Sequence, residues 1–161
     1  MNIELSRVRQ NYWAILVAAA ACFLFEAVWY SIFLQPWLNG IGRTRGWLMG
    51  AGVNPNLQYA TALVSAAVMA AAISCIIQLT GPQTVLRGIK AGVLLWLGFV
   101  LTTCSTEYVF EVRPFSLLGI NAGFWLGGMI LMGAIVGGWK RKGTALEAAP
   151  RVEKKLESMR S

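Results

Sequence analysis

The sequence predicts an all-α membrane protein, folded as an antiparallel four-helix transmembrane bundle. Of its 161 residues, 57% are hydrophobic and 13% are charged. That charged share is about half of what a soluble domain carries. The chain also contains four apolar runs long enough to cross about 30 Å of hydrocarbon. A soluble domain, a disordered chain and a disulfide scaffold are therefore poor interpretations.

The four runs are joined by short connections, which favour an up-and-down bundle. Glu26 and Ser31 interrupt the first run, and alanine dominates the second. The third is the shortest, and its helix could continue toward Phe110. We place the spans at residues 12–34, 57–79, 91–106 and 115–139. Together they form a transmembrane domain over residues 1–142, followed by a basic tail over 143–161.

The distribution of basic residues predicts the orientation. Eleven of the 14 Lys and Arg residues flank the spans on the side of the two termini, and three lie on the other side. Because basic residues concentrate in cytoplasmic segments, we expect a multi-pass plasma-membrane protein with both termini in the cytoplasm. The net charge of +7 is thus explained by topology. Nothing in its placement indicates nucleic-acid binding. The three residues of the opposite side are Arg43, Arg45 and Arg113.

Three segments outside the span cores need separate interpretation. Residues 12–34 are expected to be an uncleaved signal-anchor helix rather than a lipoprotein signal ending at Cys22. The connection over residues 35–56 contains five glycines, which predict an irregular interfacial flap. The flap is either a lid over a site or a plain connector with anchoring tryptophans. The tail is either a short helix on anionic lipid or a solvated segment.

Metal and cofactor chemistry is poorly supplied. The sequence has no histidine and no aspartate, and its cysteines, Cys22, Cys75 and Cys104, fall in three different predicted spans. No zinc-like or iron-like ligand spacing exists, so we expect neither a metal nor a cofactor. The cysteines are expected to act as small apolar packing residues.

Small residues predict where helix backbones approach closely. In the second span they repeat every four residues, and the fourth span contains two GxxxG pairs. Such stripes serve packing within the bundle or a dimer interface, and we favour packing within the bundle. The residues of these stripes are Ala62, Ala66, Ala70, Gly123, Gly127, Gly133 and Gly137.

Polar residues inside the spans gather at one depth. At about 1.5 Å per residue, Glu26 lies roughly 21 Å from the inner edge and roughly 9 Å below the outer edge of the hydrocarbon. Asn121 lies at a similar depth in the fourth span. Because intramembrane polar groups face the bundle interior, we expect one hydrogen-bonded layer there. Alternatively, Glu26 only pairs with Arg113 or Asn121 to fix helix register. The candidate binding residues are Glu26, Asn121, Ser65, Ser105, Arg113, Trp29 and Tyr30.

A set of short motifs is similar to a known family. The motifs are Trp29-Tyr30 with Trp37, the run over residues 94–99, Phe110-Glu111-Val112-Arg113, Asn121-Ala122-Gly123, and Met132-Gly133-Ala134 with Trp139. Together they resemble the domain-of-unknown-function 1761 family over most of the chain except the tail. The resemblance implies a small bacterial protein that crosses the membrane four times, here the inner membrane. It implies no activity and transfers no catalytic residues.

Three classes of function can be compared. An interaction or assembly subunit needs only packing faces, with other membrane subunits or further copies as partners. A binder or carrier of a lipid-like or small polar molecule needs an accessible outer pocket around Glu26 and Asn121. An enzyme needs an acid–base pair or a nucleophile, and the sequence supplies only glutamates as general bases on that side. We therefore expect a non-catalytic protein that contacts membrane lipids, most simply an assembly subunit, with the outer-leaflet binder as alternative.

Overall fold

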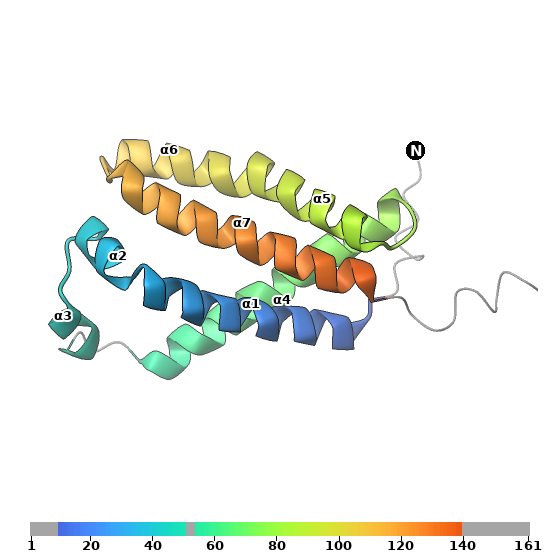
Figure 1. The fold of residues 1–161 in the computed structure, drawn as a ribbon, viewed down its shortest axis with the longest axis horizontal. Helices are drawn as coiled ribbons and strands as arrows, with labels where there is room; N and C mark the ends of the chain where they lie inside the picture. Colours follow the sequence, from blue (N-terminus) through green and yellow to red (C-terminus); the bar gives the residue numbers. More distant parts are fainter. Residues whose placement is uncertain (1–9, 51–53, 140–161) are drawn as a thin grey trace, which may run out of the picture.

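The computed structural model describes residues 10–50 and 54–139, and it is helical throughout its regular elements. Four helices are long and apolar enough to cross a membrane. They run antiparallel, so the predicted four-helix bundle is confirmed (Figure 1). The helical elements are α1 (Tyr12–Ile32), α2 (Leu34–Gly40), α3 (Arg45–Gly50), α4 (Pro55–Thr80), α5 (Val85–Leu95), a π-helical turn η2 (Trp96–Leu101), α6 (Thr102–Phe110) and α7 (Phe115–Gly138).

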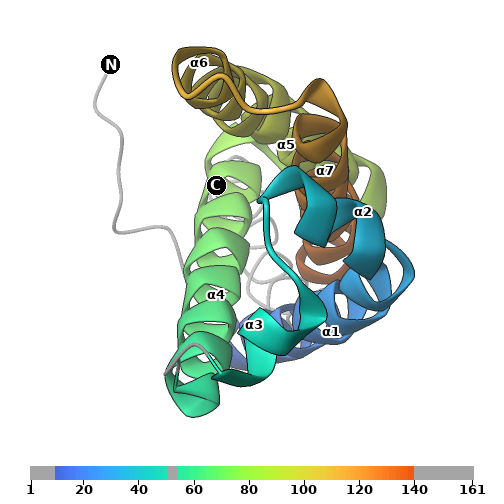
Figure 2. The same ribbon diagram turned by 90° about the vertical axis from the view of Figure 1, so that its left-hand side faces the viewer.

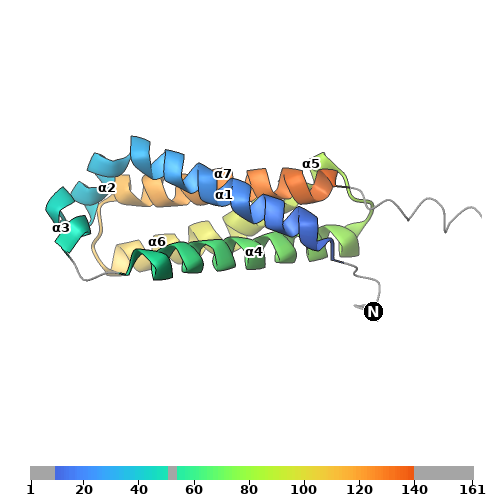
Figure 3. The ribbon, with the colours of Figure 1, turned by 90° about the horizontal axis from the view of Figure 1, so that it is seen from below.

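The bundle has two distinct ends. The start of α1 and the end of α7 lie at one end, and α2 and α3 lie at the other, which we call the α2 end (Figure 1). Figure 3 shows α1 and α7 in one layer, with α4 and α6 in the other. Helix α7 is the central element, because it packs against α1, α4 and α5.

Local sequence signals define where the long helices begin and end. The Asn11 side chain accepts a hydrogen bond from the backbone N–H of Ala14, and Thr84 caps α5 in the same way through Arg87. Gly81 ends α4 with a φ of +144°, a value that favours glycine. The Arg87 guanidinium then donates to the Thr80 carbonyl oxygen over 2.9 Å, which satisfies a carbonyl at the end of α4.

Helices α5 and α7 approach each other through glycine on both sides. A Cβ added to Gly133 would lie 2.3 Å from the carbonyl oxygen of Gly88, and one added to Gly92 would lie 2.4 Å from that of Met129. Both distances are far inside van der Waals contact, so only glycine allows this backbone separation. The α5–α7 pair is the closest helix contact of the bundle's described part.

The third span differs from a straight α-helix. The π-helical turn η2 separates α5 from α6, and hydroxyl groups that follow it bond carbonyls within it. Thr102 donates to the Gly98 carbonyl over 2.8 Å, and Thr103 donates to the Phe99 carbonyl. The Phe99 carbonyl also accepts the backbone N–H of Thr102, so both side-chain bonds lie where the π-helical turn passes into α6.

The structure corrects the prediction for the first connection. Residues 35–56 are not irregular, because they contain α2 and α3; α2 is held by Leu38, which is completely buried. The predicted third span, residues 91–106, lies within the helical segment Val85–Phe110, and Arg87 and Lys90 are exposed in the first turns of that segment. The predictions for the basic tail over 143–161 lie outside the described residues.

Candidate functional site

A pocket of about 400 Å³ opens at the α2 end, between α1 and α4. Glu26 and Tyr30 of α1 form one wall, and Tyr59 of α4 forms the opposite wall. Trp37 of α2 and Leu48 of α3 also line it, so the two short helices cover this region rather than merely connecting two spans. The remaining lining residues are Phe23, Ala27, Leu34, Gln58 and Ala62.

Glu26 is half-buried in this pocket and is its single ionisable carboxyl. Within residues 10–50 and 54–139, no hydrogen bond or ion pair joins its side chain to another residue. Arg113, a partner that the sequence suggested, instead pairs with Glu111 and stands 5.4 Å from the ring of Tyr108. Glu26 therefore does not fix helix register through either alternative that the sequence left open.

Asn121 forms the polar centre of the neighbouring helix interface. The Tyr30 hydroxyl donates to its side-chain oxygen over 2.9 Å, and its amide donates to the Tyr108 hydroxyl. These bonds connect α1, α7 and α6. Because Tyr30 also lines the pocket, the hydrogen-bonded chain Tyr30–Asn121–Tyr108 links the pocket wall to the third span.

Two tryptophans bond the carbonyls on either side of Asn121. Trp29 donates its indole N–H to the Ile120 carbonyl over 3.1 Å, and Trp96 donates to the Ala122 carbonyl over 2.8 Å. We call the bonds made to residues 120–122 the Asn121 belt. The belt joins both α1 and the third span to α7. About one helical turn after Asn121, Phe124 packs against Tyr30 with ring centroids 5.4 Å apart.

The predicted single polar layer is wrong in its composition. The described residues contain no hydrogen bond that joins Glu26, Ser65 or Ser105 to Asn121, and both serines lack a hydrogen-bond partner. Tyr108 occupies the place expected for the serines. Depth along the helix axes brought these residues to one level, but their rotation about those axes directs them to different neighbours.

The small-residue stripes of the fourth span face two different helices. Gly123 and Gly127 face the aromatic side chains of α1, where a Cβ on Gly127 would lie 2.7 Å from the ring of Phe25. Gly133 and Gly137 face α5. In the second span Ala66 and Ala70 are buried, whereas Ala62 lines the pocket.

Sequence reasoning missed the partners of the fourth-span glycines. Gly88 and Gly92 of α5 are themselves four residues apart, and this GxxxG spacing could have predicted their role. Nothing in the spacing of Tyr108 indicated a bond to Asn121.

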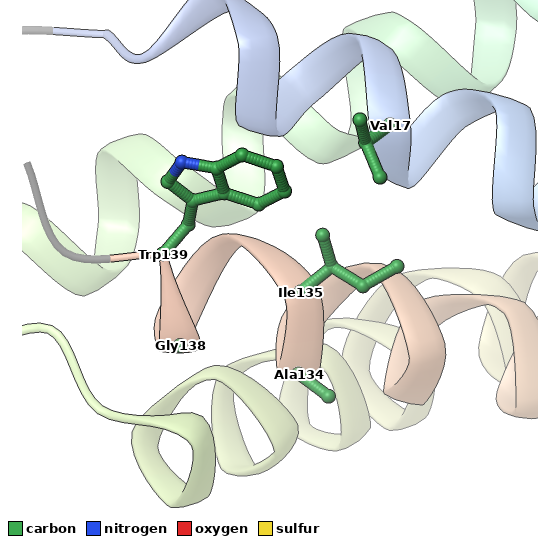
Figure 4. Close-up of a pocket in the computed structure, with 5 residues that line it drawn as sticks. All are labelled: Val17, Ala134, Ile135, Gly138 and Trp139. Atoms are coloured by element: carbon green, nitrogen blue, oxygen red, sulfur yellow. The ribbon is translucent and has the colours of Figure 1, made fainter.

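Two further hollows have different character. One of about 600 Å³ lies between α1 and α7 at the other end of the bundle; its lining is apolar apart from one indole N–H (Figure 4). Its lining side chains carry no charge and no hydroxyl group. Another, of about 380 Å³, contains Arg43 and Arg113 at the α2 end, and Arg43 stacks 5.0 Å from the ring of Trp47. The lining residues in Figure 4 are Val17, Ala134, Ile135, Gly138 and Trp139.

The described part of the chain contains no group of three potential metal ligands, and Cys22, Cys75 and Cys104 are free thiols there. The chemistry of the site is therefore that of one carboxyl, aromatic rings and an amide. This combination suits binding of a small molecule, and the hydroxyls of Tyr30 and Tyr59 add two polar groups to the same lining.

Comparison with known proteins gives a single family. No curated protein and no solved structure matches the chain. A family model described as "Protein of unknown function (DUF1761)" matches residues 13–137, which include all four long helices almost completely. With its bundle of four membrane-length helices, the chain belongs to the DUF1761 family of proteins of unknown function.

Proposed function

We propose that this protein binds a small amphiphilic molecule, lipid-like or polar, in the outer leaflet of a bacterial inner membrane. The observation that carries the proposal is the 400 Å³ pocket that contains Glu26. Its volume is within the range of small-molecule sites, about 300–1,000 Å³. A charge at the centre of a membrane helix costs about 2.5–3.5 kcal/mol on insertion scales, and this carboxyl is not used to hold the described fold together.

The cover of the pocket supports binding more than connection. Trp37 and Leu48 come from two separate short helices and line the same cavity. Helix α2 is anchored on α7, because Leu38 is buried and Gly40 lies directly against Leu117. The α2 part of the cover is thus held in place, and a pre-organised wall lowers the entropic cost of binding.

The orientation belongs to the same proposal. With eleven basic residues on the side of the termini and three on the other, both termini face the cytoplasm and the α2 end faces the periplasm. The pocket then opens in the outer leaflet. A complete transport path would need further copies or other subunits, because four helices seldom enclose one.

The test compares two alanine-to-tryptophan variants on α1. Ala27 lines the pocket, whereas Ala20 lies two turns away on an exposed face outside it. Native mass spectrometry after mild detergent extraction should find a retained small molecule or lipid with the wild type and with Ala20→Trp. Ala27→Trp fills the cavity and should lose that molecule. Equal retention by both variants would contradict binding in this pocket.

An assembly subunit is the second candidate. The third span is the least buried of the four long helices. Beyond η2, α6 packs on α7 but not closely on α4, so one side of α6 has no helical neighbour among the described elements (Figure 2). If the wild type instead purifies in a stoichiometric larger complex without a retained small molecule, the assembly function is supported.

A further inference from the structure

The Glu26 pocket lacks a compensating positive charge. Its lining contains one carboxyl and no basic residue. Among the described basic residues near this end, Arg43 stacks on Trp47 and Arg113 pairs with Glu111. Arg45, at the start of α3, is exposed and does not line the pocket. A carboxylate held in an apolar environment is stabilised only when a cation, hydrogen-bond donors or water reaches it. A ligand can therefore supply the positive charge that would compensate the Glu26 carboxylate.

Aromatic rings surround the position of that charge. Tyr30 and Trp37 meet edge to face on the α1–α2 side, with centroids 5.7 Å apart. Phe23 and Tyr59 do the same across the α1–α4 side, at 5.8 Å. All four rings line the pocket. The faces of such rings carry partial negative charge and attract organic cations, most strongly where water is excluded.

We infer that the ligand of this pocket carries an organic cation, an ammonium group on an apolar body, which Glu26 and the surrounding rings recognise together. The inference rests on the proposed binding function and specifies its ligand class. A metal ion is a poor alternative, because the described residues hold no group of three ligating side chains. An anionic ligand would place a second negative charge beside the Glu26 carboxylate. A neutral ligand would leave the charge of that carboxylate without a counter-charge.

The charge of the ligand is tested with two probes of nearly equal shape. Benzyltrimethylammonium carries a quaternary nitrogen, and neopentylbenzene carries a quaternary carbon at the same position. Binding of each is measured by equilibrium dialysis of protein-loaded nanodiscs against empty nanodiscs, which corrects for partition into lipid. The wild type should bind the cation at least tenfold more tightly than the neutral isostere.

Three variants identify the recognising groups. Glu26→Gln keeps the shape and should weaken cation binding at least tenfold without changing binding of the neutral probe. Glu107→Gln is the matched control, because Glu107 is an exposed carboxyl of α6 outside the pocket, and it should change neither. Tyr59→Leu removes a largely exposed ring while keeping the wall apolar, and it provides an independent result if Glu26→Gln does not fold. Tyr59→Leu too should weaken binding of the cationic probe and leave binding of the neutral probe unchanged.

The outcomes separate the inference from the function on which it rests. If both probes bind equally, and Ala27→Trp abolishes both while Glu26→Gln and Tyr59→Leu change neither, the pocket binds ligands but the cation inference is wrong. If neither probe binds the wild type, both proposals are contradicted. If Glu107→Gln reduces cation binding as much as Glu26→Gln does, the cation is attracted by the negative surface charge of the protein. That result would also overturn the inference.

Discussion

Substitution of Gly133 by alanine tests the close approach of α5 and α7. The added Cβ would lie 2.3 Å from the Gly88 carbonyl oxygen and 2.7 Å from the Gly88 carbonyl carbon. Both are backbone atoms of the facing helix, so no side-chain rotation relieves the overlap and the helices must separate. Gly119 of the same helix provides the control, because a Cβ there has no neighbour within 4 Å.

The expected magnitude follows from two opposing effects. Overpacking in a tight interior costs about 1–3 kcal/mol. Replacing glycine by alanine within a helix stabilises the helix by up to about 1 kcal/mol. With the full helix gain, Gly133→Ala should therefore lose about 0–2 kcal/mol of unfolding free energy, whereas Gly119→Ala should gain about 1 kcal/mol, so the two variants should differ by about 1–3 kcal/mol. Gly127→Ala should fall between them, because its neighbour is the movable ring of Phe25.

The assay is unfolding by sodium dodecyl sulfate in mixed micelles, followed by tryptophan fluorescence. Trp29 and Trp96 both lie in interfaces that unfolding separates, so the signal reports helix dissociation. A loss of 1.4 kcal/mol corresponds to about a tenfold fall in the folding equilibrium constant, which such titrations resolve. Equal midpoints and slopes for Gly133→Ala and Gly119→Ala would refute the described backbone contact.

Further predictions concern the Asn121 belt, the two serines, the turn after α4 and the topology. Asn121→Leu leaves two tyrosine hydroxyls without their partner and should cost about 1–3 kcal/mol in the same titration. Ser65→Ala and Ser105→Ala remove no described bond and should stay within about 0.5 kcal/mol; a larger loss in either would restore these serines to the polar layer. Trp96→Phe loses the bond to the Ala122 carbonyl and should cost about 1 kcal/mol, whereas Trp139→Phe, at an exposed position, should not. Gly81→Ala should lower the thermal unfolding temperature because φ is +144°, while Gly98→Ala has open space and should not. Reporter fusions after Lys142 should behave as cytoplasmic and those near Gly42 as periplasmic, and the reverse result at either site would contradict the orientation.

The spans could be predicted closely because the hydropathy of a segment depends on its own residues. The helix that was expected to begin at residue 57 begins at Pro55, where proline is well suited to the first turn. The helix that contains the predicted third span begins at Val85, six residues before that span. Arg87 and Lys90 lower the hydropathy of its first turns, although both side chains are exposed at the end of the helix. A hydropathy criterion therefore misses helical residues that lie beside charged residues at the end of a span.

The site was less predictable because it depends on helix rotation and on tertiary packing. The depth of Glu26 follows from residue counting, but its position beside Tyr59 requires the tilt of α4 relative to α1. Likewise, the sequence predicts Asn121 to be an intramembrane polar residue, but its partner Tyr108 lies on another helix. The short helices α2 and α3 are not predictable from the sequence, because their glycines lower helix propensity. In α2, the complete burial of Leu38 in tertiary packing compensates for that low propensity.

The π-helical turn sets the phase of the third span. In an uninterrupted α-helix, about 100° of rotation per residue would place Trp96 and Tyr108, twelve positions apart, about 120° away from each other. Both nevertheless bond adjacent residues of α7, Ala122 and Asn121. One surplus residue within Trp96–Leu101 removes about 100° of that offset. Deleting one residue there would restore a regular helix and turn either Tyr108 or the glycine face of α5 away from α7. The length of this segment is therefore constrained more tightly than the identity of its individual residues.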